Sequence, residues 1–275
     1  MSIDSSKYSD PSYFKISLQS PMIVAVAGGA DAGKRDLCEV LMKNFSAAYA
    51  ARVVVVSLTD FYRELTPEER GLYEAGKFNL DHPDVFDYQL LEDTLVSMKA
   101  GKPTAIPVWD HVHHTKKTTR VIDPVDVIML EGTLLFYPKS LRDLMFMKIF
   151  IDVDSEKRLV RRVQKAKSRN GHTLSIKELL TEYVEFVKPM FDDYILPTKK
   201  FADLIIPRGI ENQAALQVLS NHLDDHLKAR SVSRKKRADD SEEPTADIRN
   251  TRKPSYRSTE LLATSAASSY KQIPE

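Results

Sequence analysis

The chain has 275 residues, with 40 Lys and Arg against 39 Asp and Glu and a formal net charge of +1. This length suits one medium-sized α/β domain with appendages, and the near-balance of charge argues against nucleic acid as a partner. Cys38 is the single cysteine, which excludes an internal disulfide and fits a reducing compartment such as the cytoplasm.

The sequence contains no segment suited to a membrane. No apolar stretch approaches the roughly 20 residues that a spanning helix needs. Residues 1–20 are polar and lack the apolar centre of a signal peptide. We therefore expect a flexible N-terminal lead, a cytoplasmic location and no membrane partner.

Five short apolar runs predict strands. The first, Met22–Ala27, follows Pro21 and is apolar throughout, which suits a strand buried on both faces of a parallel sheet. The other four are Arg52–Leu58, Val125–Leu130, Met147–Asp152 and Leu204–Pro207.

Helical segments alternate with these strands. They lie at residues 87–99, 155–168, 175–195 and 211–228. This alternation predicts an α/β fold in which a parallel sheet carries helices on both faces, and we place that domain at 21–230. Residues 231–275 hold too few large apolar side chains to offset the entropy of ordering, which predicts a disordered polar tail. The basic cluster Arg234–Arg237 in this tail is either a solvated segment or a nuclear address.

The loop after the first strand has the spacing of a phosphate-binding loop. Gly28, Gly33 and Lys34 complete the pattern G-x-x-x-x-G-K, and residues 36–45 after it carry apolar side chains at helical spacing. In this context backbone N–H groups, the helix N-terminus and the lysine charge surround a phosphate. The predicted ATP-binding residues are Gly28, Gly29, Ala30, Asp31, Ala32, Gly33, Lys34 and Arg35.

Two residues of this loop suit nucleotide binding poorly. The position after Lys34 is normally a Ser or Thr whose hydroxyl binds Mg²⁺, but Arg35 offers no oxygen. Asp31 brings a negative charge into the phosphate cradle. At about 5 Å and an effective dielectric near 20, that charge opposes a phosphate charge by roughly 3 kcal/mol, or about two orders of magnitude in affinity. Screening removes most of this penalty if the side chain points to solvent.

Acidic residues follow two predicted strands, at the edge where ligands of parallel sheets bind. Asp60 comes after the second strand and Glu131 comes directly after the third. A carboxylate there serves as a general base toward a hydroxyl or holds a metal. The alternative is that each carboxylate caps a helix or stabilises a turn.

Two further groups of side chains face open alternatives. Trp109 lies close to His111, His113 and His114, which suits stacking on a planar base with polar edges better than a metal site, because no Cys or acidic partner stands at a metal-binding spacing. The predicted helix 155–168 contains Arg158, Arg161 and Arg162, and these arginines either clamp phosphates or form a solvated basic face.

Longer stretches are similar to the uridine-cytidine kinase family over about residues 20–228. The matching stretches are Asp60–Arg63, Phe78–Asp84, Ile106–Val108 with Asp110, Glu131–Gly132, Phe186–Pro189, Leu196–Lys200, Ala202–Asp203 and Ile205–Gly209. The resemblance implies a P-loop kinase fold with a β-hairpin near the base pocket. It also implies a homotetramer that transfers phosphate from ATP or GTP, with Mg²⁺, to the 5′-hydroxyl of uridine and cytidine.

The resemblance also implies roles for single residues. Asp81 would hold the ribose hydroxyls, and His114 would read the base edge. Trp109 stands where the family usually has a Tyr that contacts the base. Arg162 matches an arginine near substrate and phosphates and is our second catalytic candidate beside Asp60, and Glu131 matches the acidic residue of the metal site, where Asp60 is the second candidate ligand.

Three departures from the family pattern fall on the chemistry. Arg35 replaces the loop hydroxyl. The family's catalytic Asp usually stands at the position of Thr59, and Asp60 comes one residue later, which on extended backbone points its side chain the opposite way. His172, a predicted substrate-binding residue after Gly171, replaces a lid arginine, and Glu182 stands where the family often has Gln.

Three functions remain open from the sequence. The first is an active pyrimidine ribonucleoside kinase that uses Asp60 and Glu131 around Mg²⁺. The second is a catalytically weak or inactive member that acts as a binding or regulatory subunit, assembled with an active relative. The third is a P-loop kinase for another small acceptor, because Trp109 alters the base pocket.

Overall fold

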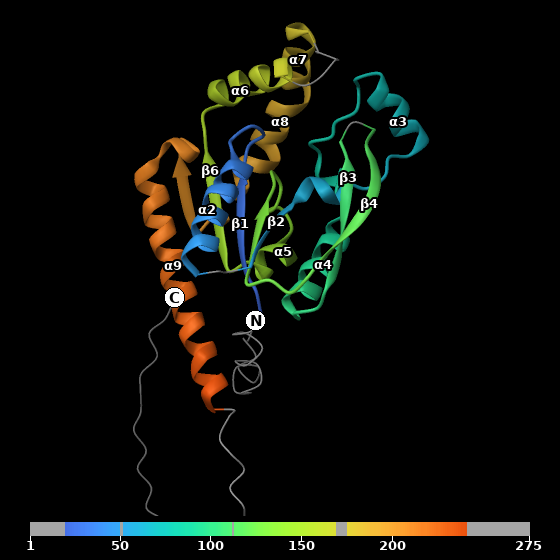
Figure 1. Cartoon of the computed structure of the whole chain (residues 1–275). Coiled ribbons are helices and arrows are strands. Elements are labelled where there is room, and N and C mark those ends of the chain that lie inside the picture. The colour runs from blue at the N-terminus through green and yellow to red at the C-terminus, as the bar shows by residue number, and fades with distance from the viewer. Residues whose placement is uncertain (1–19, 50–51, 112, 169–174, 241–275) are drawn as a thin grey trace, which may run out of the picture.

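Strand β1, Met22–Gly28, lies at the centre of a parallel five-stranded sheet. The structure is a computed structural model that describes residues 20–49, 52–111, 113–168 and 175–240. The strand order is β2-β5-β1-β6-β7 (Figure 1). The other four strands are β2 Val53–Ser57, β5 Val127–Glu131, β6 Met147–Asp152 and β7 Leu204–Pro207.

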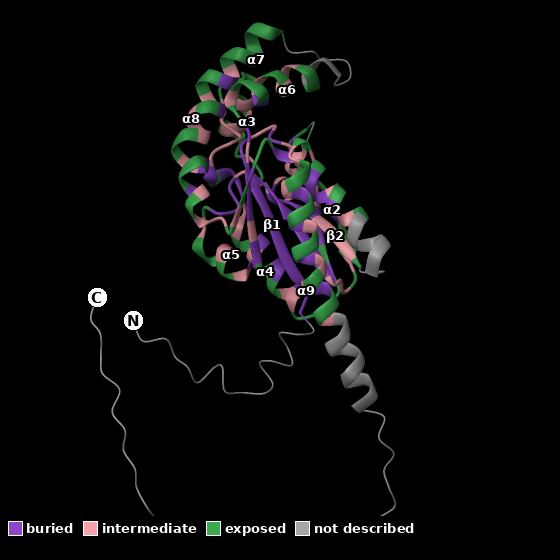
Figure 2. Ribbon diagram, turned by 90° about the vertical axis from the view of Figure 1, so that its left-hand side faces the viewer, coloured by how far each residue is buried: buried purple, intermediate pink, exposed green. Residues whose placement is uncertain are grey.

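Every residue of β1 is buried, because alternate side chains enter two separate cores. Ile23 and Ala25 pack in the core that includes helix α4, Tyr88–Lys99, and helix α5, Lys139–Leu144. Met22 and Val24 pack in the core that includes α2, Lys34–Tyr49, and α9, Gln213–Asp240. Figure 2 shows the result, with buried strands between helices whose outer faces are exposed. The predicted α/β architecture is confirmed.

Helices α6, Ser155–Ser168, and α7, Ile176–Glu182, extend over the edge of the sheet where its strands end (Figure 1). The predicted single helix at 175–195 follows the right path but contains two π-helical turns, Tyr183–Val187 and Phe191–Ile195, on either side of α8, Lys188–Met190. Pro189 lies between them. Since its ring excludes a regular α-helical bond to the preceding turn, the helix widens around it.

An antiparallel hairpin forms a second, smaller sheet beside β2. It consists of β3, Thr104–Asp110, and β4, Thr115–Ile122, with a register shift between Val108 and Trp109. Helix α3, Pro67–Glu74, lies next to its tip (Figure 1). The residues between 100 and 125 show no regular alternation, so only the family resemblance predicted this hairpin.

Helix α9 continues to Asp240, so the predicted start of the tail at residue 231 falls inside a helix. Arg, Lys and Ala are good helix formers, which explains why the backbone stays helical through this polar stretch. Residues 241–275 and 1–19 lie outside the described part of the chain. Within the described part, no helix combines the length and apolar character that crossing a membrane requires.

Gly132, directly after β5, tests how tightly the sheet edge is packed. A Cβ at this position would lie 2.5 Å from the Cβ of Leu58, so we expect Gly132→Ala to destabilise the fold by about 1–3 kcal/mol through overpacking. Urea unfolding measures this change.

The matched control is Gly71→Ala, because a Cβ at Gly71 meets no atom within 4 Å and the residue lies inside α3. Removing a helical glycine is expected to stabilise the helix by about 0.5–1 kcal/mol. Equal stability of Gly132→Ala and the wild-type chain would contradict the packing described above.

Candidate functional site

The phosphate-binding loop connects β1 to α2 at the centre of the sheet edge. Gly28 and Gly33 have φ angles of +148° and +92°, which L side chains rarely adopt. A Cβ on Gly28 would also lie 2.6 Å from the carbonyl oxygen of Ile151, and one on Gly29 would lie 2.4 Å from Nη1 of Arg158. The loop therefore needs these glycines for its shape and for its contacts with β6 and α6.

The side chain of Lys34 turns back onto its own loop. Its Nζ donates to the carbonyl oxygen of Gly29 at 2.9 Å. Burial lowers the pKa of Lys34, whereas Glu131, Asp31 and Asp81 act in the opposite direction. The phosphate-loop lysine, the predicted metal ligand and the predicted ribose ligand therefore come together from three separate parts of the chain.

A chain of hydroxyl groups orients Glu131. Ser57 and Glu131 are paired at the ends of β2 and β5, and Ser57 Oγ donates to Glu131 Oε1 at 2.5 Å. The Thr59 hydroxyl lies 2.9 Å from Ser57 Oγ. Because Ser57 has a single hydroxyl proton and gives it to Glu131, Thr59 is the donor in this second bond. Thr59 thus supports the Glu131 carboxylate indirectly.

Asp60 lies in a 3₁₀ turn, Leu58–Phe61, that directly follows β2. The expectation of extended backbone here was wrong. With about three residues per turn, a shift of one residue rotates the side chain by about 120° rather than reversing it. Burial raises the pKa of Asp60, while Arg120, His111 and Arg35 oppose that shift. The Asp60 carboxylate therefore interacts electrostatically with Arg120 of β4 as well as with Arg35 at the phosphate loop.

Arg35 does not point into the phosphate site. Its side chain is 66% exposed, and its Nε lies 3.4 Å from Glu39 Oε1, one turn further along α2. An exposed pair of this kind contributes little stability. Arg35 thus leaves the position of the usual loop hydroxyl without an oxygen donor.

The oxygen atoms at the ends of β2 and β5 fit Mg²⁺. Carboxylates of Glu131 and Asp60 and the hydroxyl of Thr59 are hard donors of the type that this ion prefers. Among the described residues, no group of three or more His, Cys, Asp or Glu side chains is placed to hold a metal alone. This suits an ion bound jointly by one or two carboxylates and the phosphates of a nucleotide.

Predicted substrate residues gather on the hairpin side. His114, with φ of 48°, is buried, and burial lowers its pKa, which favours the neutral imidazole. Trp109 is buried beside Tyr62, with ring centroids 5.8 Å apart, and its Nε1 has no partner among the described residues. Asp81 has a raised pKa because of burial, opposed first by Arg162 and then by Lys34.

The arginines of α6 face the loop rather than solvent. Arg158 is 3% exposed, stacks 3.8 Å above the ring of Phe191 and covers Gly29. Arg161 Nη1 donates to the carbonyl oxygen of Ala32 at 3.1 Å. Arg162 pairs with Glu182 of α7 at 2.7 Å. Of the two readings of these arginines, the solvated face is excluded. His172 lies outside the described residues.

The comparisons with known proteins agree with this geometry. The profile of the Phosphoribulokinase / Uridine kinase family matches residues 23–215. Uridine-cytidine kinase 2-B of Danio rerio is 42% identical over 215 residues, 76% of this chain and 82% of the relative. Uridine-cytidine kinase B of Dictyostelium discoideum is 42% identical over 216 residues, 78% and 86% of the two chains. The chain belongs to the uridine-cytidine kinase family.

Solved structures show the fold of this family member. Phosphoribulokinase from Rhodobacter spheroides is similar with a TM-score of 0.53 and 13% identity over 69% of this chain and 70% of that one. D-glycerate 3-kinase from Cryptococcus neoformans is similar with a TM-score of 0.51 and 17% identity over 69% and 87%. The fold is that of the P-loop kinases.

Several residues that support the site of this family member were missed from the sequence. Ser57 ends a buried strand with a hydroxyl, which is a signal that was available. Tyr62 and Tyr73 were not assigned, although their rings lie 6.0 and 4.4 Å from that of His114. Arg70 donates to the carbonyl oxygen of His114. Both Tyr73 and Arg70 belong to α3, whose apolar content is too low to predict its role.

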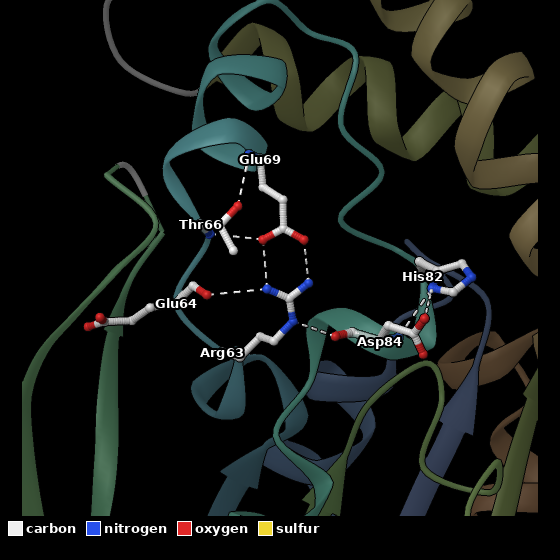
Figure 3. Close-up of polar contacts among 6 residues, drawn as sticks. All are labelled: Arg63, Glu64, Thr66, Glu69, His82 and Asp84. Atoms are coloured by element: carbon white, nitrogen blue, oxygen red, sulfur yellow. Dashed lines mark hydrogen bonds and ion pairs between the residues drawn. The ribbon is translucent and has the colours of Figure 1, made fainter.

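Arg63 connects the start of helix α3 to the domain (Figure 3). Arg63 donates from Nη1 and Nη2 to the two carboxylate oxygens of Glu69, at 2.7 and 2.6 Å, and from Nε to the carbonyl oxygen of Asp84 at 2.7 Å. Glu69 also accepts from the backbone N–H of Thr66, completing a capping box at the start of α3. This network sets the position from which α3 holds His114.

Glu69 gives the network a dependence on pH. Its bonds to Arg63 and Thr66 lower the pKa of Glu69 to about 2 from an ordinary 4.5. The folded state therefore binds fewer protons, so this contribution to stability is complete above about pH 4.5 and is lost as pH falls toward 2. We expect Glu69→Gln to be less stable than wild type at pH 6 and to lose less stability between pH 5 and about 2.

Urea unfolding at a series of pH values measures this difference. Glu68→Gln is the control, because Glu68 is the exposed neighbour of Glu69 in the same helical turn. Parallel stability curves for Glu69→Gln and wild type over this pH range would show that the ion pair does not hold α3.

Proposed function

We propose that this protein is an ATP-dependent kinase that phosphorylates the 5′-hydroxyl of uridine and cytidine and serves pyrimidine salvage in the cytoplasm. The observation that carries the proposal is the environment of Lys34. Its buried ammonium lies in the phosphate loop, and the carboxylates of Glu131, Asp31 and Asp81 all act on its pKa. This electrostatic environment supports a site in which the predicted phosphate, metal and ribose ligands act together.

Each group then has a role in placing the reactants. Backbone N–H groups of the loop and Lys34 hold the phosphates of ATP or GTP. Glu131, oriented by Ser57, holds Mg²⁺, which when bound neutralises charge on the phosphates. Asp81 accepts from the ribose hydroxyls, and Arg162 approaches the transferring phosphate from α6. Such positioning and charge stabilisation supply most of phosphoryl-transfer catalysis.

The base is held between aromatic side chains and His114. The neutral imidazole of His114 offers one donor and one acceptor to the edge of a pyrimidine. Trp109 supplies a stacking face, and its unpartnered Nε1–H is a donor available to a carbonyl oxygen of the base. Both features favour a planar heterocycle. The third possibility, another small acceptor, rests on the same Trp109, because it alters the base pocket.

Asp60 is the general base in this proposal. A carboxylate with a raised pKa is a stronger proton acceptor than an ordinary one, and burial raises the pKa of Asp60. Thr59 cannot take this part, because a hydroxyl is not basic and its proton already goes to Ser57. We expect slow turnover, since the base stands one residue from its usual position and Arg35 supplies no metal ligand.

The alternative is a catalytically weak or inactive member that binds nucleotide or regulates an active relative. Two observations favour it: Thr59 is engaged in supporting Glu131, and Arg35 is turned to Glu39. Retention of Lys34, Asp81 and Glu131 favours the kinase.

Turnover with ATP, Mg²⁺ and uridine or cytidine separates these functions. We expect the wild-type chain to form nucleoside monophosphate slowly and Asp60→Asn to reduce the rate by about 10²–10⁴-fold, the range for loss of a general base. Restoring the family residues in Arg35→Ser with Thr59→Asp is expected to raise kcat by at least about tenfold.

Asp36→Asn is the control for these variants, because Asp36 is exposed at the start of α2. No product from wild type at high enzyme concentration, together with turnover gained by Arg35→Ser/Thr59→Asp, would overturn the kinase assignment in favour of the inactive subunit. Product formation unaffected by Asp60→Asn would overturn the role of Asp60.

We also propose that the protein forms a homotetramer, as the family resemblance implies. Sedimentation equilibrium is expected to give a mass of about 125 kDa, four times the 31.2 kDa of one chain. A monomeric mass for the purified chain that rises only on addition of an active relative would contradict the homotetramer and support the hetero-oligomer instead.

A further inference from the structure

Asp31 occupies an unusual place in the phosphate loop. Its φ is 61°, a left-handed conformation that Asp and Asn tolerate better than other side chains. The side chain is only 14% exposed. The carboxylate therefore stays close to the loop, and solvent screens its charge only weakly.

The carboxylate of Asp31 is paired with helix α6. Lys165 Nζ lies 3.1 Å from Oδ1, and Arg162 Nη1 lies 3.5 Å from Oδ2. The backbone on the same side is held as well, because Arg161 Nη1 donates to the carbonyl oxygens of Asp31 and Ala32 at 3.4 and 3.1 Å. Three cations of α6 thus contact two adjacent residues of the loop.

We propose that Asp31 is an internal anion that latches α6 onto the phosphate loop and competes with nucleotide phosphate for Arg162 and Lys165. This rests on the proposed function only in taking nucleotide phosphate as the competing ligand. Asp31 is a positioning and affinity-setting residue and takes no part in the chemical step.

The charges of this contact support the competition. Arg162 is shared between Asp31 and Glu182, and Lys165 pairs with Asp31. The charges of these two cations and two anions therefore offset one another. An arriving phosphate therefore gains attraction from this group only as Asp31 is displaced, since an anion near neutralised cations is not drawn in at long range.

The same contact positions helix α6. Arg162 and Lys165 lie one turn apart on α6 and reach the loop together. Among the described residues, the Asp31 carboxylate pairs with both Arg162 and Lys165 and so joins them to the loop. Without this carboxylate, like-charged side chains of α6 would face Lys34 across the loop, so α6 is expected to open in the absence of nucleotide.

Asp31→Asn is the direct test, because Asn also tolerates the left-handed backbone and keeps the shape of the side chain. Two measurements are made: the dissociation constant for MgATP, with tripolyphosphate as a second probe, and amide hydrogen exchange across α6 without nucleotide. We expect the variant to bind both probes about 10- to 100-fold more tightly and α6 to exchange several-fold faster.

Two controls complete the experiment. Asp36→Asn removes an exposed carboxylate close to the same loop and is expected to change neither measurement. Lys165→Gln breaks the latch from the other side, and α6 is expected to exchange faster in that variant too, whether or not it binds nucleotide well.

Unchanged exchange in Asp31→Asn would overturn the latch, and tighter binding without faster exchange would leave simple charge repulsion as the explanation. Unchanged affinity for both probes would overturn the competition. Failure of the proposed kinase activity is distinguishable, because it appears as absence of product, whereas an inactive member that still binds MgATP tests both the competition and the latch. Absence of MgATP binding in both the wild-type chain and Asp31→Asn would overturn the competition, while the exchange measurement would still decide the latch.

Discussion

The double burial of β1 is the constraint on which the rest of the site depends. Its alternate side chains fill two cores. A shift of the strand by one residue would therefore move the side chains of each core into the other. Its register with β5 and β6 is fixed by the same packing. Gly28 therefore emerges at one defined point, beside Ile151 of β6 and two residues beyond the pairing of Val26 with Glu131.

Buried charge at this edge is only partly paired. Lys34 donates to the carbonyl oxygen of Gly29, and Arg158, which is almost fully buried, lies over the ring of Phe191 while its Nη1 has no hydrogen-bond partner among the described residues. A buried charge without a partner is costly, so each of these groups restricts where its neighbours lie. The result is a rigid set of polar atoms at the carboxyl edge, with α6 held above it by ion pairs.

The departures from the family pattern have a common physical meaning. Thr59 and Arg35 each remove an oxygen donor or proton acceptor near the phosphates, and Asp31 adds a negative charge among them. Under the proposed function, the first two are expected to weaken the chemical step and the third to weaken nucleotide binding. Thr59 supports Glu131 through Ser57. Its hydroxyl, which stands where the family usually has a carboxylate, is therefore hydrogen-bonded within this network.

The sequence by itself determined the family, through its resemblance over several long stretches. It also determined the parallel sheet and the phosphate loop, because apolar periodicity and glycine spacing are local properties of the chain. It did not determine the direction of Asp60, the outward turn of Arg35 or the pairing of Asp31 with α6. The 3₁₀ turn after β2 depends on Ser57 capping it, and the ion pairs of Asp31 join residues more than 130 positions apart. The cap formed by Ser57 and the pair of Arg35 with Glu39 are local contacts, but a local sequence permits several such arrangements and only the folded structure shows which one forms. The pairing of Asp31 was decided by the tertiary structure alone, since the energy of a charged group depends on which distant residues folding brings beside it.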